Sequence, residues 1–252
     1  RQRQMCIRDR FDVDGTLAET EEVHRKSFNK SFAQAGLDWE WSPEMYAELL
    51  GVTGGKERIR YYLDTYLPSF KAPMNLDDYI AALHAAKTDI YTRTVGSGGV
   101  ALRPGVRRLL QEAREAGLRL GIATTTTPAN VTALLEHSLE PQALDWFEVI
   151  AAGNMVPAKK PAPDVYEFAM EAMEVKPQEC IAFEDSVNGL RSAQAAGLRT
   201  LVTISQYTQR QEFNGAALVV DQLGEPDQPF SVIAGDADDH RFVSVQLLRE
   251  LC

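Results

Sequence analysis

The chain of 252 residues carries a formal net charge of −10, and 44% of its residues are hydrophobic. This length suits one core domain with an insertion, or two domains. The acidic balance excludes nucleic acid and acidic membranes as partners, because neither attracts negative charge. Cys6, Cys180 and Cys252 have no Cys-x-x-Cys spacing, and no apolar run is long enough to span a membrane. We therefore expect a cytoplasmic protein without a zinc site, a disulfide framework or a membrane partner.

Residues 1–10 do not suit the position that they occupy before the first motif. A strand buried on both faces of a parallel sheet should be a continuous apolar run, whereas Arg8, Asp9 and Arg10 are charged. Burying these charges without partners costs several kcal/mol each. We therefore interpret residues 1–10 as a non-native leader that has replaced the original strand, and sequencing the source gene across Arg10 and Phe11 tests this interpretation.

Two carboxylates, Asp12 and Asp14, lie two positions apart in the stretch Phe11-Asp12-Val13-Asp14-Gly15-Thr16. In extended backbone such residues point to the same side, and Gly15 permits the sharp turn that exposes the tip of a strand. Like charges at this spacing are unfavourable without a cation or a proton, which indicates a hard divalent metal such as Mg²⁺. The pattern alone also fits a solvated turn. A calcium loop is excluded because it needs oxygen ligands at alternate positions, where apolar residues follow here.

Residues 18–100 are expected to form a helical cap inserted after this motif. The apolar periodicity predicts helices over 19–32, 43–50, 56–67 and 76–94, with no convincing strand among them. The segment Gly96-Ser97-Gly98-Gly99 is flexible by composition and suits a hinge through which the chain returns.

After Arg103-Pro104-Gly105, helices and strands alternate, which is typical of an α/β protein with a parallel sheet and crossover helices. Residues 11–17 and 101–252 are therefore assigned to the core domain, with Gly235–His240 as an acidic loop. The predicted helices cover 106–116, 128–138, 163–173, 187–196 and a last segment from Val243, and the predicted strands cover 118–124, 147–151, 180–183, 201–204 and 217–220.

The ends of the predicted strands carry polar residues, and ligands of open parallel sheets bind outside those ends. The four groups are Asp12 with Asp14, the run Thr124–Thr127, Lys159 with Lys160, and Glu184 with Asp185. Together they have the parts that phosphoryl transfer needs: a nucleophile, a divalent metal and donors for the phosphoryl oxygens.

Each acid in this set has a predicted role. Asp12 is expected to attack phosphorus and form an aspartyl-phosphate. Asp14 is expected to protonate the leaving oxygen, then to activate water, and to contact the metal through its carbonyl. Asp12, Glu184 and Asp185 are expected to hold Mg²⁺ through their carboxylates.

The remaining residues of the set each have a structural alternative. Thr124 and Lys160 are expected to bind phosphoryl oxygens, although a threonine run can also satisfy backbone groups. One of Lys159 and Lys160 is expected to be solvated. We choose Lys160 for the site because the prolines that follow it fix its direction. Glu184 and Asp185 would alternatively stabilise a helix N-terminus.

The motifs in this order resemble the haloacid dehalogenase superfamily of phosphatases. Phe11 to Leu17 looks like its first motif, Thr124 its second, Lys160 its third and Glu184-Asp185 its fourth. The resemblance extends from Phe11 to about Val220. It implies a Rossmann-like core, Mg²⁺ dependence and the roles given above, and the insertion is similar to a helical cap of the β-phosphoglucomutase type.

Several cap segments are similar to the CbbY branch of that superfamily, the xylulose-1,5-bisphosphate phosphatases, which remove an inhibitory by-product of Rubisco in the Calvin cycle. The resemblance implies that Glu19 binds sugar hydroxyls, and that a distal phosphate is held by Thr53, Gly54, Gly55, Lys56 and Arg58. His24, Lys87, Thr125 and Thr126 are further substrate-binding candidates. For Lys87 a charged helix face is the alternative, and for His24 it is packing.

The expected activity is therefore hydrolysis of a sugar bisphosphate, with xylulose-1,5-bisphosphate as the preferred substrate, by a monomeric Mg²⁺-dependent enzyme. The motifs alone do not separate this activity from that of a β-phosphoglucomutase-like mutase or a phosphoglycolate-type phosphatase. A non-catalytic binding module would lack the nucleophile or a metal carboxylate, and this chain has both.

Overall fold

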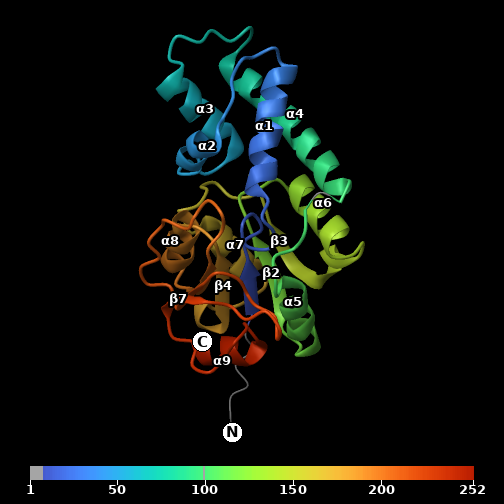
Figure 1. Cartoon of the computed structure of the whole chain (residues 1–252), viewed down its shortest axis with the longest axis vertical. Coiled ribbons are helices and arrows are strands. Elements are labelled where there is room, and N and C mark those ends of the chain that lie inside the picture. The colour runs from blue at the N-terminus through green and yellow to red at the C-terminus, as the bar shows by residue number, and fades with distance from the viewer. Residues whose placement is uncertain (1–7, 99) are drawn as a thin grey trace.

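The computed structural model describes residues 8–98 and 100–252, with a helical cap above an α/β core (Figure 1). The core is built on a seven-stranded sheet in the order β3-β2-β1-β4-β5-β6-β7. Neighbouring strands are parallel, except that β7 runs antiparallel to β6. The strands are β1 (Arg8–Phe11), β2 (Arg119–Ala123), β3 (Phe147–Ala151), β4 (Cys180–Glu184), β5 (Arg199–Thr203), β6 (Leu218–Val220) and β7 (Val232–Gly235).

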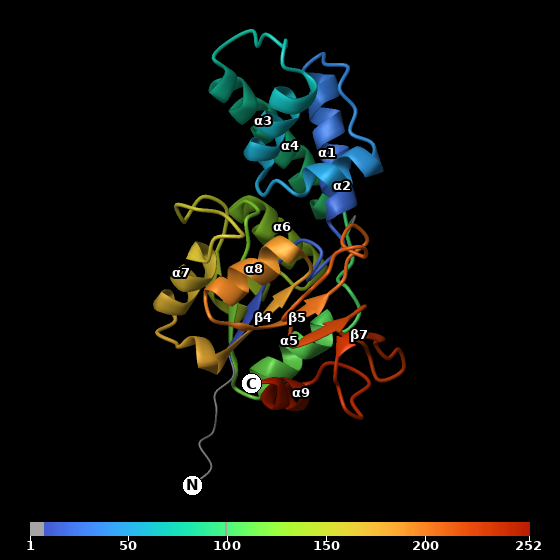
Figure 2. The ribbon, with the colours of Figure 1, turned by 90° about the vertical axis from the view of Figure 1, so that its left-hand side faces the viewer.

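Helices cover both faces of this sheet, which explains why β2 and β4 are largely apolar on both sides (Figure 2). On one face Leu120 and Ile122 of β2 join the cluster that includes residues of α5, α6 and α9. On the other face the small side chains Ala123 and Ala182 let α7 and α8 pack closely. These core helices are α5 (Val106–Glu115), α6 (Pro128–Ser138), α7 (Asp164–Ala172), α8 (Val187–Ala195) and α9 (Val245–Leu251), with 3₁₀ turns η1 (Ala143–Trp146) and η2 (Pro177–Glu179).

The central strand β1 differs from what its sequence led us to expect. Although its residues include charged ones, β1 pairs with β2 on one side and β4 on the other, with Phe11 opposite both Ile122 and Phe183. The rings of Phe11 and Phe183 stack at 4.3 Å, and Asp9 is completely buried. Backbone pairing on both edges therefore forms the strand despite its charges. Residues 1–7 lie outside the described part, so a non-native leader stays a prediction.

The cap consists of α1 (Glu21–Gln34), α2 (Pro43–Leu49), α3 (Gly55–Tyr66) and α4 (Leu76–Gly96). Ser42 and Asn75 cap the N-termini of α2 and α4 with their side-chain oxygens. A separate hydrophobic cluster holds the four helices together and includes the aromatic residues Phe28, Phe32, Trp39, Trp41, Tyr46 and Tyr62. Ala18, together with Tyr91 and Val95 of α4, packs in the cluster of the core instead, so the division into a cap of residues 18–100 and a core stays a prediction.

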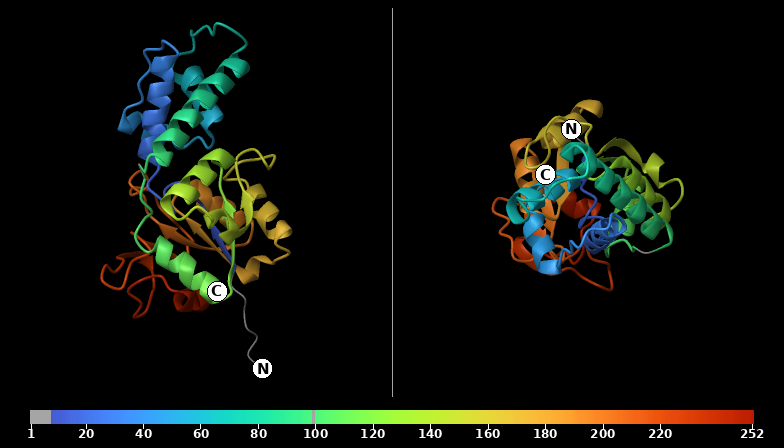
Figure 3. Two further views of the ribbon diagram at one scale, coloured as in Figure 1. Left: turned by 90° about the vertical axis from the view of Figure 1, so that its right-hand side faces the viewer. Right: turned by 90° about the horizontal axis from the view of Figure 1, so that it is seen from above.

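Two chain segments join the cap to the core side by side. Ala18 on the outgoing segment forms a bridge with Leu102 on the returning one, and Arg103 donates its backbone N–H to the carbonyl of Leu17 at 2.9 Å. The predicted hinge lies just before this point, with Gly99 outside the described residues. Seen from above in Figure 3, the cap lies over one end of the core.

The strand β7 was not predicted, and Gly235 ends it rather than starting the acidic loop. All four residues of β7 are exposed, so its sequence has no buried face to produce an apolar pattern. Among residues 8–98 and 100–252, no helix has the combination of length and apolar character that crossing a membrane requires.

Candidate active site

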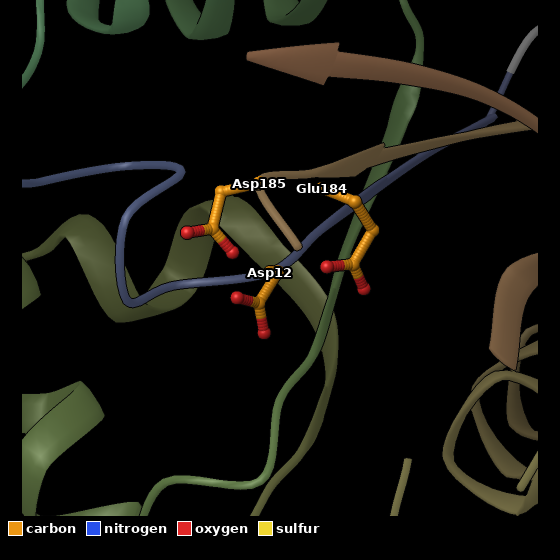
Figure 4. A group of neighbouring side chains, drawn as sticks. All are labelled: Asp12, Glu184 and Asp185. Atoms are coloured by element: carbon orange, nitrogen blue, oxygen red, sulfur yellow. The ribbon is translucent and has the colours of Figure 1, made fainter. Parts of the chain in front are cut away.

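Three carboxylates gather where β1 and β4 end (Figure 4). Asp12 follows β1, and its backbone N–H donates to the carbonyl of Phe183 at 3.0 Å, which places it beside Glu184. Asp12, Glu184 and Asp185 are all buried and each offers an oxygen within 4.8 Å of the others. The structure therefore brings together the three predicted carboxylate ligands of the metal.

The electrostatics of this group fit a divalent cation. Burial raises the pKa of Asp12 to about 7, because the opposing effect of Lys160 is smaller and Glu184 and Asp14 add to the rise. Burial also raises the pKa of Asp185, together with the charges of Asp12 and Glu184. Within the residues that the structure describes, Glu184 Oε2 is buried and makes no hydrogen bond. Acidic oxygens crowded in this way match the ligand preference of Mg²⁺.

Lys160 lies inside the group and partly neutralises it. Its Nζ donates to Asp12 Oδ1 at 2.8 Å, to Glu184 Oε1 at 2.7 Å and to the carbonyl of Ala123 at 2.8 Å. Burial alone would lower the pKa of Lys160, but the two carboxylates outweigh burial and raise it above its ordinary value. Lys159 has a different place, since its Nζ donates to Glu57 of the cap at 2.7 Å.

The threonine run divides into two parts. Thr124 is buried at the end of β2, and its Oγ1 accepts the N–H of Thr126 at 3.3 Å. Thr127 caps α6, because its Oγ1 accepts the N–H of Asn130. All four threonines line the cavity described below, and Thr127 is at the same time the N-cap residue of α6.

Asp14 is turned toward the cap rather than toward the other acids. Its Oδ1 accepts hydrogen bonds from Thr20 Oγ1 at 2.5 Å and from His24 Nε2 at 2.9 Å. His24 Nδ1 in turn lies 2.6 Å from Lys87 Nζ, and its ring stacks on Tyr91 at 4.1 Å. His24 and Lys87, which the sequence indicated as substrate ligands, therefore also form a network behind the predicted acid–base residue.

The chemistry of this network fixes its direction. A lysine ammonium has only hydrogens to donate, so His24 Nδ1 accepts and His24 Nε2 carries the hydrogen donated to Asp14. Burial would raise the pKa of Asp14, but the positive charge of the His24–Lys87 pair and the hydrogen bonds of His24 and Thr20 outweigh burial and lower the pKa to about 2. Burial lowers the pKa of Lys87 to about 8.

A cavity of about 570 Å³ lies between cap and core and contains these groups. The volume falls in the range of small-molecule sites. Its core wall carries Asp12, Asp14, Lys160 and the threonines, and its cap wall carries further polar and positively charged residues. The cap residues among its lining include Glu21, His24, Thr53, Gly54, Gly55, Lys56, Arg58, His84 and Lys87.

Two predicted cap residues have other contacts than expected. The guanidinium of Arg58 donates to the carbonyls of Leu49 and Val52 and to the hydroxyl of Tyr46, so it braces the loop before Thr53. Glu19 is absent from the cavity lining and lies 3.5 Å from Arg103. Glu21 lines the cavity instead, because α1 begins at that residue and turns it inward.

Sequence reasoning did not identify several residues that join cap and core at the cavity. Asn188, in the first turn of α8, donates to Thr53 Oγ1 at 3.1 Å. Tyr207 donates to Glu22 of α1 at 2.7 Å. Asn188 could have been found because it follows the fourth motif at a strand end, whereas Tyr207 lies in a loop with no pattern of its own.

The family of the chain follows from comparison with known proteins. A model for the haloacid dehalogenase-like hydrolases matches residues 11–197, so the chain belongs to that family. Within it, the chain is 54% identical over 206 residues to protein CbbY of Rhodobacter capsulatus, covering 82% of this chain and 88% of the relative. It is 46% identical over 243 residues to a plasmid CbbY of Cupriavidus necator, covering 95% and 94%.

Solved structures agree with this assignment. The CbbY of Rhodobacter sphaeroides in complex with phosphate is 47% identical, has a TM-score of 0.80, and matches 86% of this chain and 94% of its own. A mutant of that protein in complex with xylulose-(1,5)bisphosphate gives the same values. The family match and these relatives confirm the α/β fold and the enzyme class predicted from the sequence, a phosphoric monoester hydrolase of the haloacid dehalogenase type.

Proposed function

We propose that this enzyme is a Mg²⁺-dependent sugar bisphosphate phosphatase and that xylulose-1,5-bisphosphate is its substrate. The observation that carries the proposal is a cavity between cap and core with Asp12 and its acidic neighbours on the core side and cations on the cap side. The similarity to CbbY proteins, one of them in complex with xylulose-(1,5)bisphosphate, supports this choice of sugar.

Asp12 is the nucleophile in this proposal. Its Oδ1 is held by Lys160 at 2.8 Å, which favours the ionised form and fixes the side chain beside Thr124 and the entering phosphoryl group. Attack on phosphorus forms the aspartyl-phosphate and breaks the bond to the sugar oxygen. Asp12, Glu184 and Asp185 would hold Mg²⁺, which supplies positive charge to the phosphoryl oxygens when bound.

Asp14 handles the proton with help from the cap. In the first step Asp14, which is ionised at rest, takes a proton from His24 Nε2–H and passes it to the leaving oxygen, while Lys87 donates a proton to His24 Nδ1. In the second step water attacks the phosphorus of the aspartyl-phosphate and gives a proton to Asp14. This step breaks the bond to Asp12 and releases phosphate, and the same chain returns a proton to Lys87. The contacts from Asp14 to His24 and from His24 to Lys87, at 2.9 and 2.6 Å, support this path.

The distal phosphate is assigned to the cap end of the cavity. Gly54 and Gly55 lead into α3, where backbone N–H groups and the helix dipole favour an anion, and Lys56 adds a charged donor. Glu21 is assigned to the sugar hydroxyls in place of Glu19, since it lines the cavity.

A panel of phosphate esters assayed for released phosphate tests this function. It should contain xylulose-1,5-bisphosphate, the matching monophosphates, hexose phosphates and phosphoglycolate, each with and without Mg²⁺. We expect the highest kcat/KM for the bisphosphate and no turnover after chelation. Conversion between hexose phosphate isomers without phosphate release would instead identify a mutase, and preference for phosphoglycolate would replace the sugar assignment.

A further inference from the structure

Arg103 is a buried arginine at the point where the chain returns from the cap, and the proposed mechanism does not use it. Only 8% of the residue is exposed, although it carries a charge. Its guanidinium donates to the backbone carbonyls of three separate segments. The acceptors are Gly15 within the first motif, Thr203 at 3.3 Å and Ile204 at 2.6 Å at the end of β5, and Asp221 at 2.7 Å after β6.

Two of these segments enclose the side chain of Asp185. A Cβ added at Gly15 would lie 2.2 Å from Asp185 Oδ2, so the carboxylate packs directly against that glycine. On the other side Ser205, the residue after Ile204, donates its hydroxyl to Asp185 Oδ2 at 2.8 Å. The guanidinium of Arg103 therefore links the two segments, at Gly15 and at Ser205, that contact the Asp185 carboxylate from either side.

The charge of Arg103 argues for a role in positioning rather than in electrostatic support. Burying a guanidinium is costly unless its donors are satisfied, and burial lowers the pKa of Arg103. A positive charge near a divalent cation would by itself weaken cation binding. The planar fork of an arginine, however, offers five donors spread over three nitrogens, so it can reach carbonyls on several segments, whereas the three donors of a lysine all radiate from one atom.

We propose that Arg103 is a positioning residue for the metal ligand Asp185, acting through Gly15 and Ser205. The inference rests on the metal site of the proposed function. Because Arg103 also lies 3.5 Å from Glu19 on the segment that leads into the cap, it fixes the core end of the hinge in the same set of contacts.

The test measures cation binding directly, by calorimetric titration of the full-length protein with Mg²⁺ and with Mn²⁺. The variants are Arg103→Lys, which keeps the charge, and Arg103→Met, which removes it. We expect Kd to rise about tenfold or more in both, since loss of a residue that orients a ligand costs 10–100-fold. An unchanged Kd in a folded Arg103→Lys protein, or tighter binding by Arg103→Met, would overturn the proposal.

Arg108 provides the matched control. Its guanidinium also binds two backbone carbonyls, those of Gly224 and Val243 at 2.8 and 2.9 Å, but none of its contacts reaches the acidic group. We expect Arg108→Lys to lower thermal stability without changing Kd. An equal rise of Kd in Arg108→Lys would show that general destabilisation is the cause and would overturn the inference.

If the Arg103 variants do not fold, Ser205→Ala provides the test instead. This substitution removes the hydrogen bond from Ser205 to Asp185, through which Arg103 is proposed to act. We expect it to weaken cation binding and, in combination with Arg103→Lys, to have a less than additive effect. Unchanged binding by Ser205→Ala would exclude the route through Ser205. If the unaltered protein binds neither Mg²⁺ nor Mn²⁺, the proposed function itself is wrong. This result differs from the outcomes above, in all of which the unaltered protein binds the cation.

Discussion

Two aspartates two positions apart have opposite surroundings. Asp12 lies among buried acids, and its pKa is raised to about 7, whereas Asp14 is held by His24 and Thr20, and its pKa is lowered to about 2. Environments that separate the pKa values of neighbouring carboxyl groups are typical of groups with different catalytic roles. This contrast supports different catalytic roles for the two residues, and the position of Asp12 beside Glu184 and Asp185, rather than its pKa, assigns it the attack on phosphorus.

Replacing the nucleophile gives the most direct prediction. Asp12→Asn keeps the size of the side chain but removes the attacking oxygen anion, so we expect phosphate release to fall by a factor on the order of 10⁴ or more. Circular dichroism should show an unchanged fold. Near-normal turnover by a preparation free of the original enzyme would exclude covalent catalysis by Asp12.

The proton path predicts a specific pH profile. The pKa of Lys87 is lowered by burial to about 8, so we expect kcat to decline as the pH rises through that value and Lys87 loses its proton. Lys87→Met should reduce kcat roughly 100-fold and remove this decline. The control is Lys26→Met, on the exposed face of the same cap. A decline that persists in Lys87→Met would assign it to another group.

The sequence was sufficient to locate the acids and Lys160, because strand ends of a parallel sheet meet at one edge. It was not sufficient for the contacts that depend on how the cap lies over the core. The network of His24 and Lys87, the inward position of Glu21 and the bonds of Arg103 join segments far apart in the chain. No local pattern encodes their distances.

At the scale of elements, the start of α3 determines the cap side of the site. The proposed distal-phosphate site predicts that Lys56→Ala raises KM for a bisphosphate about tenfold and leaves KM for a monophosphate nearly unchanged, because a charged hydrogen bond is worth about 1.5–3 kcal/mol. Initial-rate measurements with both substrates test this. Equal increases for the two would remove the assigned role.

The turn at Gly54 gives a second prediction for α3. Its φ is +99°, and a Cβ there would lie 2.2 Å from Glu57 Oε2 and 2.7 Å from Lys159 Nζ. Gly54→Ala should therefore separate Glu57 from Lys159 and raise KM. Gly36 is the control, because its φ of +73° is also positive and no atom of the described residues lies within 4 Å of the added Cβ.

Gly36→Ala should lower the free energy of unfolding by about 1–2 kcal/mol, as expected for a left-handed residue, and Gly54→Ala should lower it by more, because φ +99° with ψ +137° is essentially restricted to glycine. Only Gly54→Ala should change kinetics. A rise in KM for Gly36→Ala of the same size would mean that stability alone controls KM.

The elements also show where sequence patterns fail. The amphipathic helices were predicted to within a few residues, since one face of each packs on a core. β7 was missed because its residues are exposed. Residues 8–10 are charged and therefore lack the apolar pattern of a buried strand. They form β1 because their backbone pairs with β2 on one side and with β4 on the other.

For the whole molecule, the buried acids connect stability, pH and metal. The pKa of Asp12 is raised from 3.8 to about 7, so its contribution to the stability of the metal-free protein is fully present below pH 3.8 and is lost as the pH rises to about 7. Asp185 acts in the same direction. Asp14 has a lowered pKa, so its contribution is lost only as the pH falls from 3.8 through about 2.

Mg²⁺ should therefore stabilise the protein more strongly in alkaline than in acidic solution, because the carboxylates must be ionised to bind it. We expect Mg²⁺ to raise Tm more at about pH 8 than at about pH 5. At the higher pH, Mg²⁺ at a hundred times its Kd should add roughly 2.7 kcal/mol to the free energy of unfolding. Thermal unfolding with and without Mg²⁺ measures this. Asp12→Asn should reduce the difference, and equal rises at both pH values would contradict the site.

The position of β1 has a consequence for how the chain acquires its structure during synthesis. Arg8 pairs with Arg119 and with Cys180, so the central strand leaves the ribosome long before either of its neighbours. The cap helices α1 to α4 are also complete before β2 emerges. One edge of β1 then stays open to other nascent chains until β2 emerges and the other until β4 emerges, which makes this interval the stage at which aggregation and chaperone binding are favoured.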